Sequence, residues 1–148
     1  MSLKDRINDD MKAAMRARDT ARLGTIRLLL AAIKQREVDD RVTLDDAAIT
    51  AVIDKMIKQR KDSISQFEAA GRTDLASGES AEVAVLADYM PAQLSDAEVA
   101  AEVQAAVAQT GAAGPQDMGK VMGVLKPKLA GRADMTAVSA RVKAALAG

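Results

Sequence analysis

The chain has 148 residues, which is enough for one ordinary domain or for two small ones. Hydrophobic residues make up 49% of it and aromatic residues only 1%, a composition that favours helices rich in Ala, Leu and Met over sheets. The formal net charge is zero, and the absence of Cys and His excludes disulfides, thiolate catalysis, cysteine zinc sites and histidine general-base chemistry.

The first two predicted helices have clear starting signals. Ser2, with Asp5 three residues later, is typical of an N-terminal cap, and Asp19 or Thr20 begins the second helix. We expect the second helix to end near Asp39. The apolar stripe expected for the first helix is Leu3, Ile7, Met11, Ala14 and Met15.

A long third helix and a fourth helix complete the first part of the chain. Thr43 is expected to cap the third helix, and Gly71 ends it in the position that glycine favours. The fourth helix follows Thr73 or Asp74, and Gly78 inside it predicts an irregular first part, because glycine weakens a helix.

Proline and a capping box mark the start of the second part. Met90 precedes Pro91, and a residue before proline disfavours helix. Ser95 with Glu98 then predicts a capping box at the start of a fifth helix. After a turn-prone segment of small residues, 110–115, we expect a sixth helix to about Leu129 and a seventh over 135–146.

No stretch alternates with the period of two that strands require. We therefore predict an all-α fold with an N-terminal helical domain of about four helices, residues 1–91. A small basic C-terminal domain of three helices, residues 92–148, follows it.

Charge is strongly segregated along the chain. Residues 1–61 hold 14 Lys and Arg against ten Asp and Glu, and residues 115–148 hold six against two. Residues 62–114 hold one basic residue against nine acidic ones. The basic segments indicate a nucleic-acid-binding face, or else the acidic middle simply neutralises them within one fold.

The sequence offers little for catalysis. Adjacent carboxylates such as Asp9 and Asp10 point about 100° apart on a helix, so they do not converge on one ion or substrate. Gly114 to Lys120 lacks the spacing of a phosphate loop. We expect no catalytic residue, no cofactor and no metal.

The longest apolar run, Leu28 to Ile33, is too short to cross a bilayer, and no signal peptide is evident, so we expect a cytoplasmic protein without a membrane partner.

Two basic faces are predicted in the first part. The third helix carries Lys55, Lys58 and Lys61 towards solvent, and Arg60 is expected beside its apolar stripe. Arg27 and Lys34 share a face of the second helix. We expect them either to bind phosphates or to pair with carboxylates of the acidic fourth helix.

Glycine spacing singles out the sixth helix. Gly119 and Gly123 are four residues apart, so they share a face almost without side chains, at a cost of roughly 1 kcal/mol each relative to alanine. This indicates a close approach by another helix or by a nucleic-acid backbone. With no aromatic side chain nearby to stack a base, we expect recognition by shape and charge. The candidate nucleic-acid-binding residues are Gly119, Lys120, Gly123, Lys126, Lys128, Gly131, Arg132, Arg141 and Lys143.

At these residues the chain resembles the GatB/YqeY family. The strongest match is Met118-Gly119-Lys120-Val121-Met122 followed by Gly131-Arg132-Ala133-Asp134, Val138 and Val142-Lys143. Further matches are Tyr89-Met90-Pro91-Ala92-Gln93-Leu94-Ser95 and Arg27-Leu28-Leu29-Leu30-Ala31-Ala32-Ile33-Lys34, and the resemblance covers essentially the whole chain.

The resemblance implies a two-part helical fold and a role with tRNA. In the amidotransferase B subunit of the family, a similar tail helps to hold misacylated tRNA while a separate domain carries the amidating chemistry. We therefore expect a tRNA-binding or tRNA-dependent-amidotransferase-associated module without its own active site, with tRNA as partner and a tRNA-modifying enzyme or aminoacyl-tRNA synthetase as a further one. The alternatives are a helical protein-interaction adaptor and an accessory subunit of a carbon–nitrogen ligase that uses glutamine as amido donor.

Overall fold

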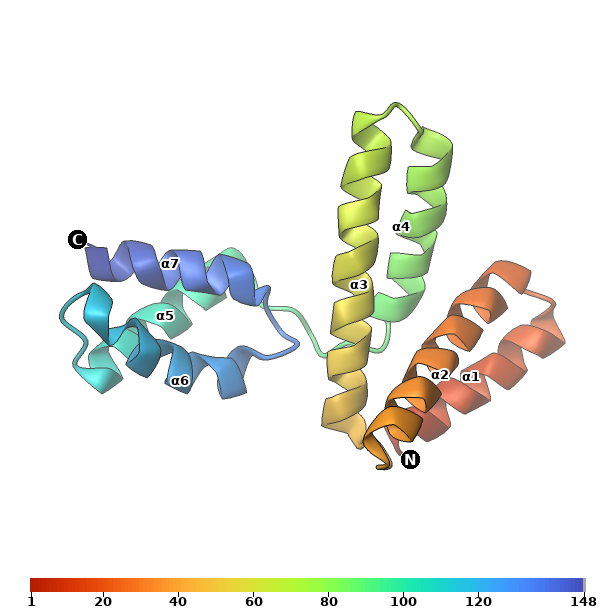
Figure 1. Ribbon diagram of the computed structural model, residues 1–148, viewed down its shortest axis with the longest axis horizontal. Helices are drawn as coiled ribbons and strands as arrows, with labels where there is room; N and C mark the ends of the chain where they lie inside the picture. The colour runs from red at the N-terminus through yellow and green to blue at the C-terminus, as the bar shows by residue number, and fades with distance from the viewer. Residues whose placement is uncertain (148) are drawn as a thin grey trace. The chain divides into compact units, whose positions relative to one another are not determined.

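The computed structural model describes residues 1–147, and within them every regular element is a helix (Figure 1). This confirms the predicted all-α fold. The chain divides into two compact units, which we call unit 1 (Met1–Met90) and unit 2 (from Pro91 onward). In chain order the elements are α1 (Leu3–Ala17), α2 (Thr20–Asp40), α3 (Asp46–Ala69), α4 (Thr73–Ala87), α5 (Asp96–Thr110), the 3₁₀-helix η1 (Pro115–Asp117), α6 (Met118–Leu129) and α7 (Met135–Ala147).

Unit 1 consists of two helical hairpins. α1 runs antiparallel to α2, and α3 runs antiparallel to α4, because each pair is joined by a very short connection (Figure 1). Burial of each large apolar side chain between the hairpins contributes roughly 1.5–3 kcal/mol. The largest fully buried side chains of unit 1 are Ile7, Ile26, Leu29, Ile33, Ile49, Ile53 and Leu86.

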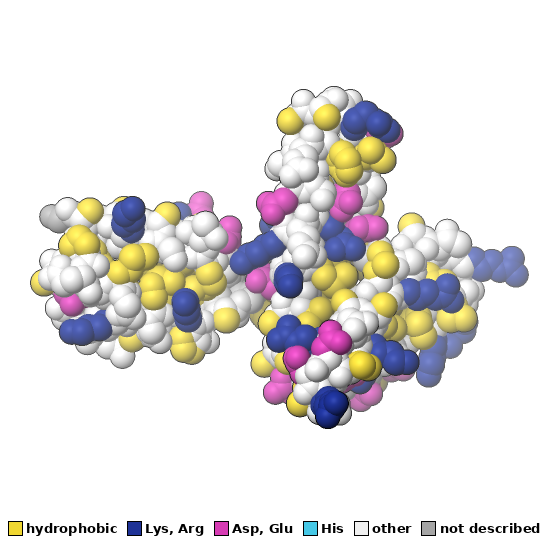
Figure 2. Space-filling view, viewed as in Figure 1, with side chains coloured by type: hydrophobic (Ala, Val, Ile, Leu, Met, Phe, Trp, Pro, Cys, Tyr) yellow, Lys and Arg dark blue, Asp and Glu magenta, His cyan; other side chains and the backbone are white. Residues whose placement is uncertain are grey.

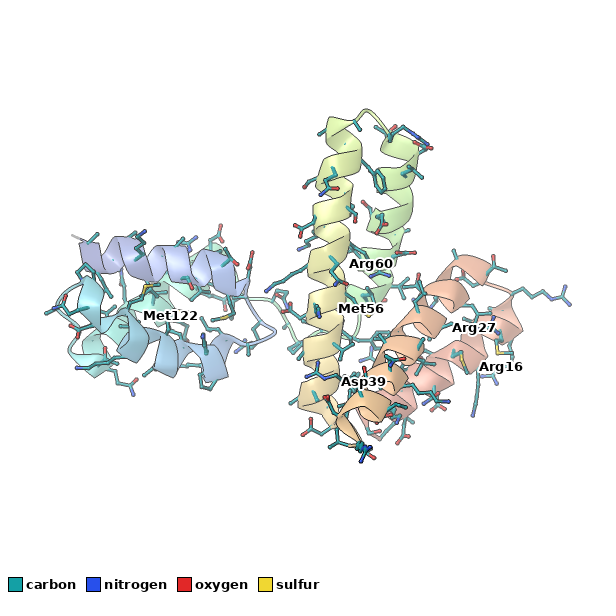
Figure 3. The ribbon with its side chains drawn as sticks, in the orientation of Figure 1. Arg16, Arg27, Asp39, Met56, Arg60 and Met122 are labelled. Carbon is teal, nitrogen blue, oxygen red and sulfur yellow. The ribbon has the colours of Figure 1, made fainter. Side chains whose placement is uncertain are left out.

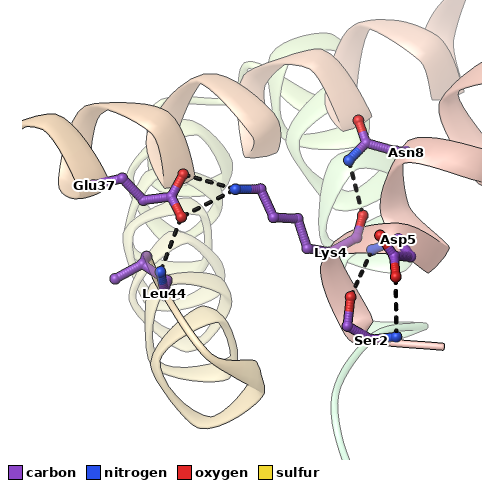
Figure 4. Close-up of polar contacts among 6 residues, drawn as sticks. All are labelled: Ser2, Lys4, Asp5, Asn8, Glu37 and Leu44. Atoms are coloured by element: carbon purple, nitrogen blue, oxygen red, sulfur yellow. Dashed lines mark hydrogen bonds and ion pairs between the residues drawn. The ribbon is translucent and has the colours of Figure 1, made fainter. Parts of the chain in front are cut away.

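Polar contacts fix the start of α1 to the end of α2 (Figure 4). Ser2 Oγ accepts the Asp5 N–H at 3.1 Å, and the Asp5 carboxylate accepts the Ser2 N–H at 3.4 Å, which is the predicted capping box. Lys4 Nζ donates to both carboxylate oxygens of Glu37, at 2.8 and 3.0 Å, and Glu37 also accepts the Leu44 N–H at 2.9 Å. These two partners hold the pKa of Glu37 below its ordinary value.

Three local predictions for unit 1 are wrong. Asp45 caps α3 in place of Thr43, because its carboxylate accepts the Ala48 N–H at 2.8 Å. α4 is continuous through Gly78, where tertiary packing against α3 outweighs the low helix propensity of glycine. Met15 lies outside the core with 50% of its surface exposed.

Unit 2 is a compact group of α5, α6 and α7. The capping box of Ser95 and Glu98 is present at the start of α5. Gly131 ends the α6 region with a φ of 76°, the left-handed conformation that glycine adopts most easily. Asp134 accepts the Thr136 N–H at 3.0 Å and so caps α7, as expected. The core of unit 2 contains Val99, Val103, Ala106, Val121, Met122, Leu125, Leu129, Val138, Val142 and Leu146.

Candidate nucleic-acid interface

One face of α6 is buried in the core of unit 2, and another is exposed to solvent. Val121, Met122, Leu125 and Leu129 are buried against α5 and α7. Gly119, Gly123 and Lys126 recur at intervals of four and three residues and are exposed, so they form one stripe of the opposite face. The sequence prediction that the two glycines share a face is consistent with this burial pattern.

No helix of the described chain approaches the two glycines. A Cβ atom added at Gly119 or at Gly123 would meet no other heavy atom within 4 Å. The close approach that their spacing indicates is therefore absent within the chain. The described residues therefore do not use this face of α6 for packing.

α7 borders this glycine face on one side. Ser139 Oγ lies 4.0 Å from Met122 Sδ, and Figure 3 places Met122 between α6 and α7. Because α7 runs back along α6, Lys143, one turn beyond Ser139, lies on the α7 flank towards the start of α6. We call Gly119, Gly123, Lys126 and Lys143 the α6–α7 surface.

Carboxylates of α5 neutralise two of the candidate cations. Lys128 Nζ lies 2.7 Å from Glu102 Oε2, and Arg141 Nη2 lies 3.4 Å from Asp96 Oδ1. Ion pairs between side chains at a protein surface add little stability. They do lower the charge that Lys128 and Arg141 present to an external phosphate.

Two more candidates have partners near the ends of α6. Lys120 Nζ lies 3.8 Å from Asp117 Oδ1. The Ala113 N–H, which donates to the Asp117 carboxylate, and Lys120 hold the pKa of Asp117 below its ordinary value. Arg132 Nε donates to the Ala92 carbonyl oxygen at 3.4 Å.

Gly131 and Arg132 also serve the fold of unit 2. The Gln93 side chain donates to the Gly131 carbonyl oxygen at 2.7 Å, and the Leu94 N–H donates to the Arg132 carbonyl oxygen at 2.9 Å. The turn after α6 is thereby fixed to the segment that precedes α5. Within residues 1–147 the candidates Lys126, Arg132 and Lys143 have no ion-pair partner. Of these three, Arg132 is engaged by the Ala92 carbonyl oxygen, whereas Lys126 and Lys143 are not engaged in this way.

The other titratable groups that the sequence singles out have structural roles. Asp10 accepts the Tyr89 hydroxyl at 2.6 Å, and burial together with this bond raises the pKa of Tyr89. Arg60 Nε lies 2.8 Å from Glu82 Oε2 of α4, so Arg60 makes the pairing with the acidic fourth helix that was considered for Arg27 and Lys34.

A groove of about 700 Å³ separates the first half of α2 from α4. Gly24 and Gly78 help to keep it open, since a Cβ at either position would contact nothing. Its charged residues are already engaged: Asp19 caps α2, Arg22 pairs with Asp88 at 3.6 Å, and Glu82 pairs with Arg60.

Across the described range, no three potential metal-ligating side chains gather in one place. Within the same range, no helix is both long enough and apolar enough to span a membrane.

Comparison with known proteins supports the resemblance. The model of the YqeY-like protein family matches residues 4–146. The chain belongs to the YqeY-like family. Among its relatives is a protein of Lachancea thermotolerans named "Altered inheritance of mitochondria protein 41, mitochondrial", which is 41% identical over 101 residues. That match covers 66% of the present chain and 54% of the relative.

Proteins with the same name occur in Kluyveromyces lactis and Eremothecium gossypii. Each is 40% identical to this YqeY-like chain over 87 residues, or 58% of the chain. The matches cover 47% and 48% of these relatives, so the chain spans about half the length of the curated relatives it matches. The expectation of a cytoplasmic protein is contradicted by these names, since each relative is named as a mitochondrial protein.

One basic region of this YqeY-like chain was not selected from the sequence. Lys12, Arg16 and Arg18 are exposed at the loop end of the α1–α2 hairpin, together with Arg27. A charge count in shorter windows would have found it: residues 11–36 contain seven Lys and Arg and a single Asp. The count over residues 1–61 concealed it, because most acidic residues of that segment belong to the other end of the hairpin.

Proposed function

We propose that this YqeY-like protein binds tRNA, and that the α6–α7 surface is a contact for the RNA backbone. The observation that carries the proposal is the open glycine face of α6, flanked by two lysines that have no ion-pair partner within residues 1–147. Glycine lets a phosphate backbone approach the helix closely, and lysine neutralises its charge.

The composition of the surface favours RNA shape over base identity. The residues of the α6–α7 surface include no aromatic side chain on which a base could stack. A folded RNA offers phosphates and 2′-hydroxyl groups whose arrangement depends on its shape. The choice of tRNA rests on the resemblance of the C-terminal segment to the tail of the amidotransferase B subunit.

The test is titration of a tRNA mixture with the full chain at several salt concentrations. In Lys126→Gln/Lys143→Gln we expect weaker binding and a slope of log affinity against log salt that is smaller by about one to two. Lys128→Gln is the matched control, because Lys128 lies on the same helix but pairs with Glu102. An equal loss in the control, or no binding at low salt, would overturn the proposal.

A protein-interaction adaptor is the second candidate, because the same open glycine face would accept a partner helix. Gly123→Leu fills the face and should abolish either kind of binding. Lys126→Gln/Lys143→Gln separates the two: an adaptor keeps its protein partner in a pull-down, whereas an RNA-binding module loses its RNA.

The third candidate is an accessory role in a carbon–nitrogen ligase. This role predicts glutamine-dependent amide formation on tRNA charged with Glu or Asp, only when partner subunits are added. Reconstitution with and without the present chain tests it, and equal activity in the two mixtures would exclude it.

A further inference from the structure

The loop end of the α1–α2 hairpin is the most strongly basic part of unit 1. The one acidic residue between residues 11 and 36, Asp19, accepts the Arg22 N–H at 3.2 Å and caps α2. Figure 2 shows Lys and Arg side chains gathered over this hairpin. We define the basic hairpin end as Lys12, Arg16, Arg18 and Arg27.

All four side chains of the basic hairpin end are exposed. None of them forms an ion pair with any residue that the structure describes. Lys12 and Arg16 stand one turn apart on α1, with a rise of about 6 Å between them. Arg16 and Arg27 lie on the two neighbouring helices of the hairpin (Figure 3).

Besides Asp19, which caps α2, and Asp9 and Asp10, which precede Lys12 on α1, the acidic residues of the hairpin lie at its other end. Glu37 pairs with Lys4, and Asp40 pairs with Arg36. Because these carboxylates are already paired and remote from the loop, they leave the field of the basic hairpin end largely uncompensated.

Arg18 and Arg41 form a natural matched pair. Each is the residue that ends a helix of the hairpin, and their φ values are 55° and 54°. This left-handed conformation is unfavourable for residues with a Cβ atom other than Asn and Asp. The two arginines differ in their surroundings: Arg18 follows Lys12 and Arg16, whereas Arg41 follows Asp39 and Asp40.

We propose that the basic hairpin end binds the phosphate backbone of a folded RNA, as a contact separate from the α6–α7 surface. The choice of RNA as the partner rests on the proposed function. Three of the four cations are arginines, whose planar guanidinium groups donate two parallel hydrogen bonds to a phosphate.

The chemistry of the basic hairpin end argues against the other polyanions. Protein interfaces have an apolar centre with aromatic anchors, whereas the large apolar side chains exposed beside these cations are Met15 and Leu28, and neither is aromatic. A helix that lies in a membrane surface needs an exposed apolar face. Most apolar side chains of α1 and α2 are buried in the core of unit 1, and Met15 and Leu28 alone do not make a continuous apolar face.

The test again uses the full chain and a tRNA mixture over a range of salt concentrations. Lys12→Gln/Arg16→Gln/Arg18→Asn should weaken binding at least about tenfold near 0.1 M salt and lower the salt slope by about two to three. The matched control is Lys55→Gln/Lys58→Gln/Lys61→Gln, which removes the same charge from α3. We expect the control to change the affinity less than about threefold.

The single changes Arg18→Asn and Arg41→Asn make the test independent of folding. Asn tolerates the left-handed conformation, so both variants should keep the helix content of the parent in circular dichroism. Arg18→Asn should weaken RNA binding about three- to eightfold, the effect of one lost phosphate contact, and Arg41→Asn should leave it within about twofold.

The outcomes separate the two proposals. If the hairpin variant binds like the parent while Lys126→Gln/Lys143→Gln binds more weakly, the hairpin contact is wrong and the proposed function stands. If instead the hairpin variant binds more weakly while Lys126→Gln/Lys143→Gln binds like the parent, the hairpin contact is supported and the α6–α7 surface is not an RNA contact. Absence of RNA binding by the parent chain at low salt overturns both, as does binding of the parent only to vesicles containing phosphatidylserine.

Discussion

In unit 2, α5 supplies carboxylates that reach cations of α6 and α7, whereas in unit 1 four cations gather at the loop end of the α1–α2 hairpin without an ion-pair partner among the described residues. Lys128 Nζ therefore lies 2.7 Å from Glu102 Oε2, and Arg141 Nη2 lies 3.4 Å from Asp96 Oδ1. Lys12 and Arg16 have no such partner within the described residues. In Figure 2 the Lys and Arg side chains on the visible face of unit 2 stand apart from one another.

The difference shows that a count of charged residues and the charge available to a ligand are separate quantities. A cation that is already paired must exchange one partner for another, so its gain from binding a phosphate is small. In unit 1, the order of residues along α1 and α2 places unpaired cations close together. In unit 2, the packing of α6 and α7 against α5 brings carboxylates to two of the cations. Variants of the two units test this contrast.

The largest expected effect concerns the core that supports the α6–α7 surface. Leu125 is completely buried, so Leu125→Ala should lower the free energy of unfolding by about 2–5 kcal/mol. Hydrogen exchange should show the loss of protection in α5, α6 and α7, with a parallel loss of the RNA contact made by unit 2. Ile26→Ala is the counterpart in unit 1 and should expose the amides of α1 and α2 instead. Loss of protection in α5 to α7 on Ile26→Ala alone would contradict this assignment.

Filling the glycine face should stabilise unit 2. Gly119→Ala and Gly123→Ala remove the helix penalty of glycine and meet no neighbouring atom, so each should raise the free energy of unfolding by about 1 kcal/mol. Gly131→Ala should instead destabilise the chain by about 1 kcal/mol, because the φ there is 76°. Denaturant unfolding measures all three. A loss of stability on Gly123→Ala would mean that part of the chain does pack against this face.

Releasing a paired cation should make unit 2 behave more like unit 1. Glu102→Gln removes the partner of Lys128, so tRNA affinity at low salt should rise by about two- to fourfold. Gln keeps the size of the side chain and limits any change in packing. The control is Glu102→Gln in a chain that already carries Lys128→Gln, where it should have no effect on tRNA affinity. An unchanged affinity in Glu102→Gln alone would show that Lys128 does not face the RNA.

The sequence predicted much of the secondary structure because the relevant signals are local. Ser95 and Glu98 lie within one turn, and Gly131 needs its unusual φ whatever surrounds it. Thr43 and Asp45 are both good capping residues two positions apart, so the choice between them depended on where α3 packs.

The candidate site was less predictable because it depends on contacts between helices. Glycine spacing identified the open face of α6, since the period of a helix is known in advance. Whether Lys128 or Lys126 is paired depends on the rotation of α6 against α5, which charge patterning does not reveal. Arg16 was not predicted as a contact because the charge count over residues 1–61 combines the basic hairpin end with ten acidic residues.

The smallest expected effect concerns the acidic end of the α1–α2 hairpin. Lys4 and the Leu44 N–H lower the pKa of Glu37 from its ordinary value of 4.5, so folding favours the ionised carboxylate. The resulting stability is present above pH 4.5 and is lost as the pH falls through the lowered pKa. Glu37→Gln should therefore destabilise the chain at pH 7 and less so in acid, as measured by denaturant unfolding at several pH values. Lys4→Gln leaves only the Leu44 contact and should reduce this pH dependence. If it does not, the backbone N–H of Leu44 rather than the ion pair with Lys4 holds the Glu37 carboxylate in its charged form.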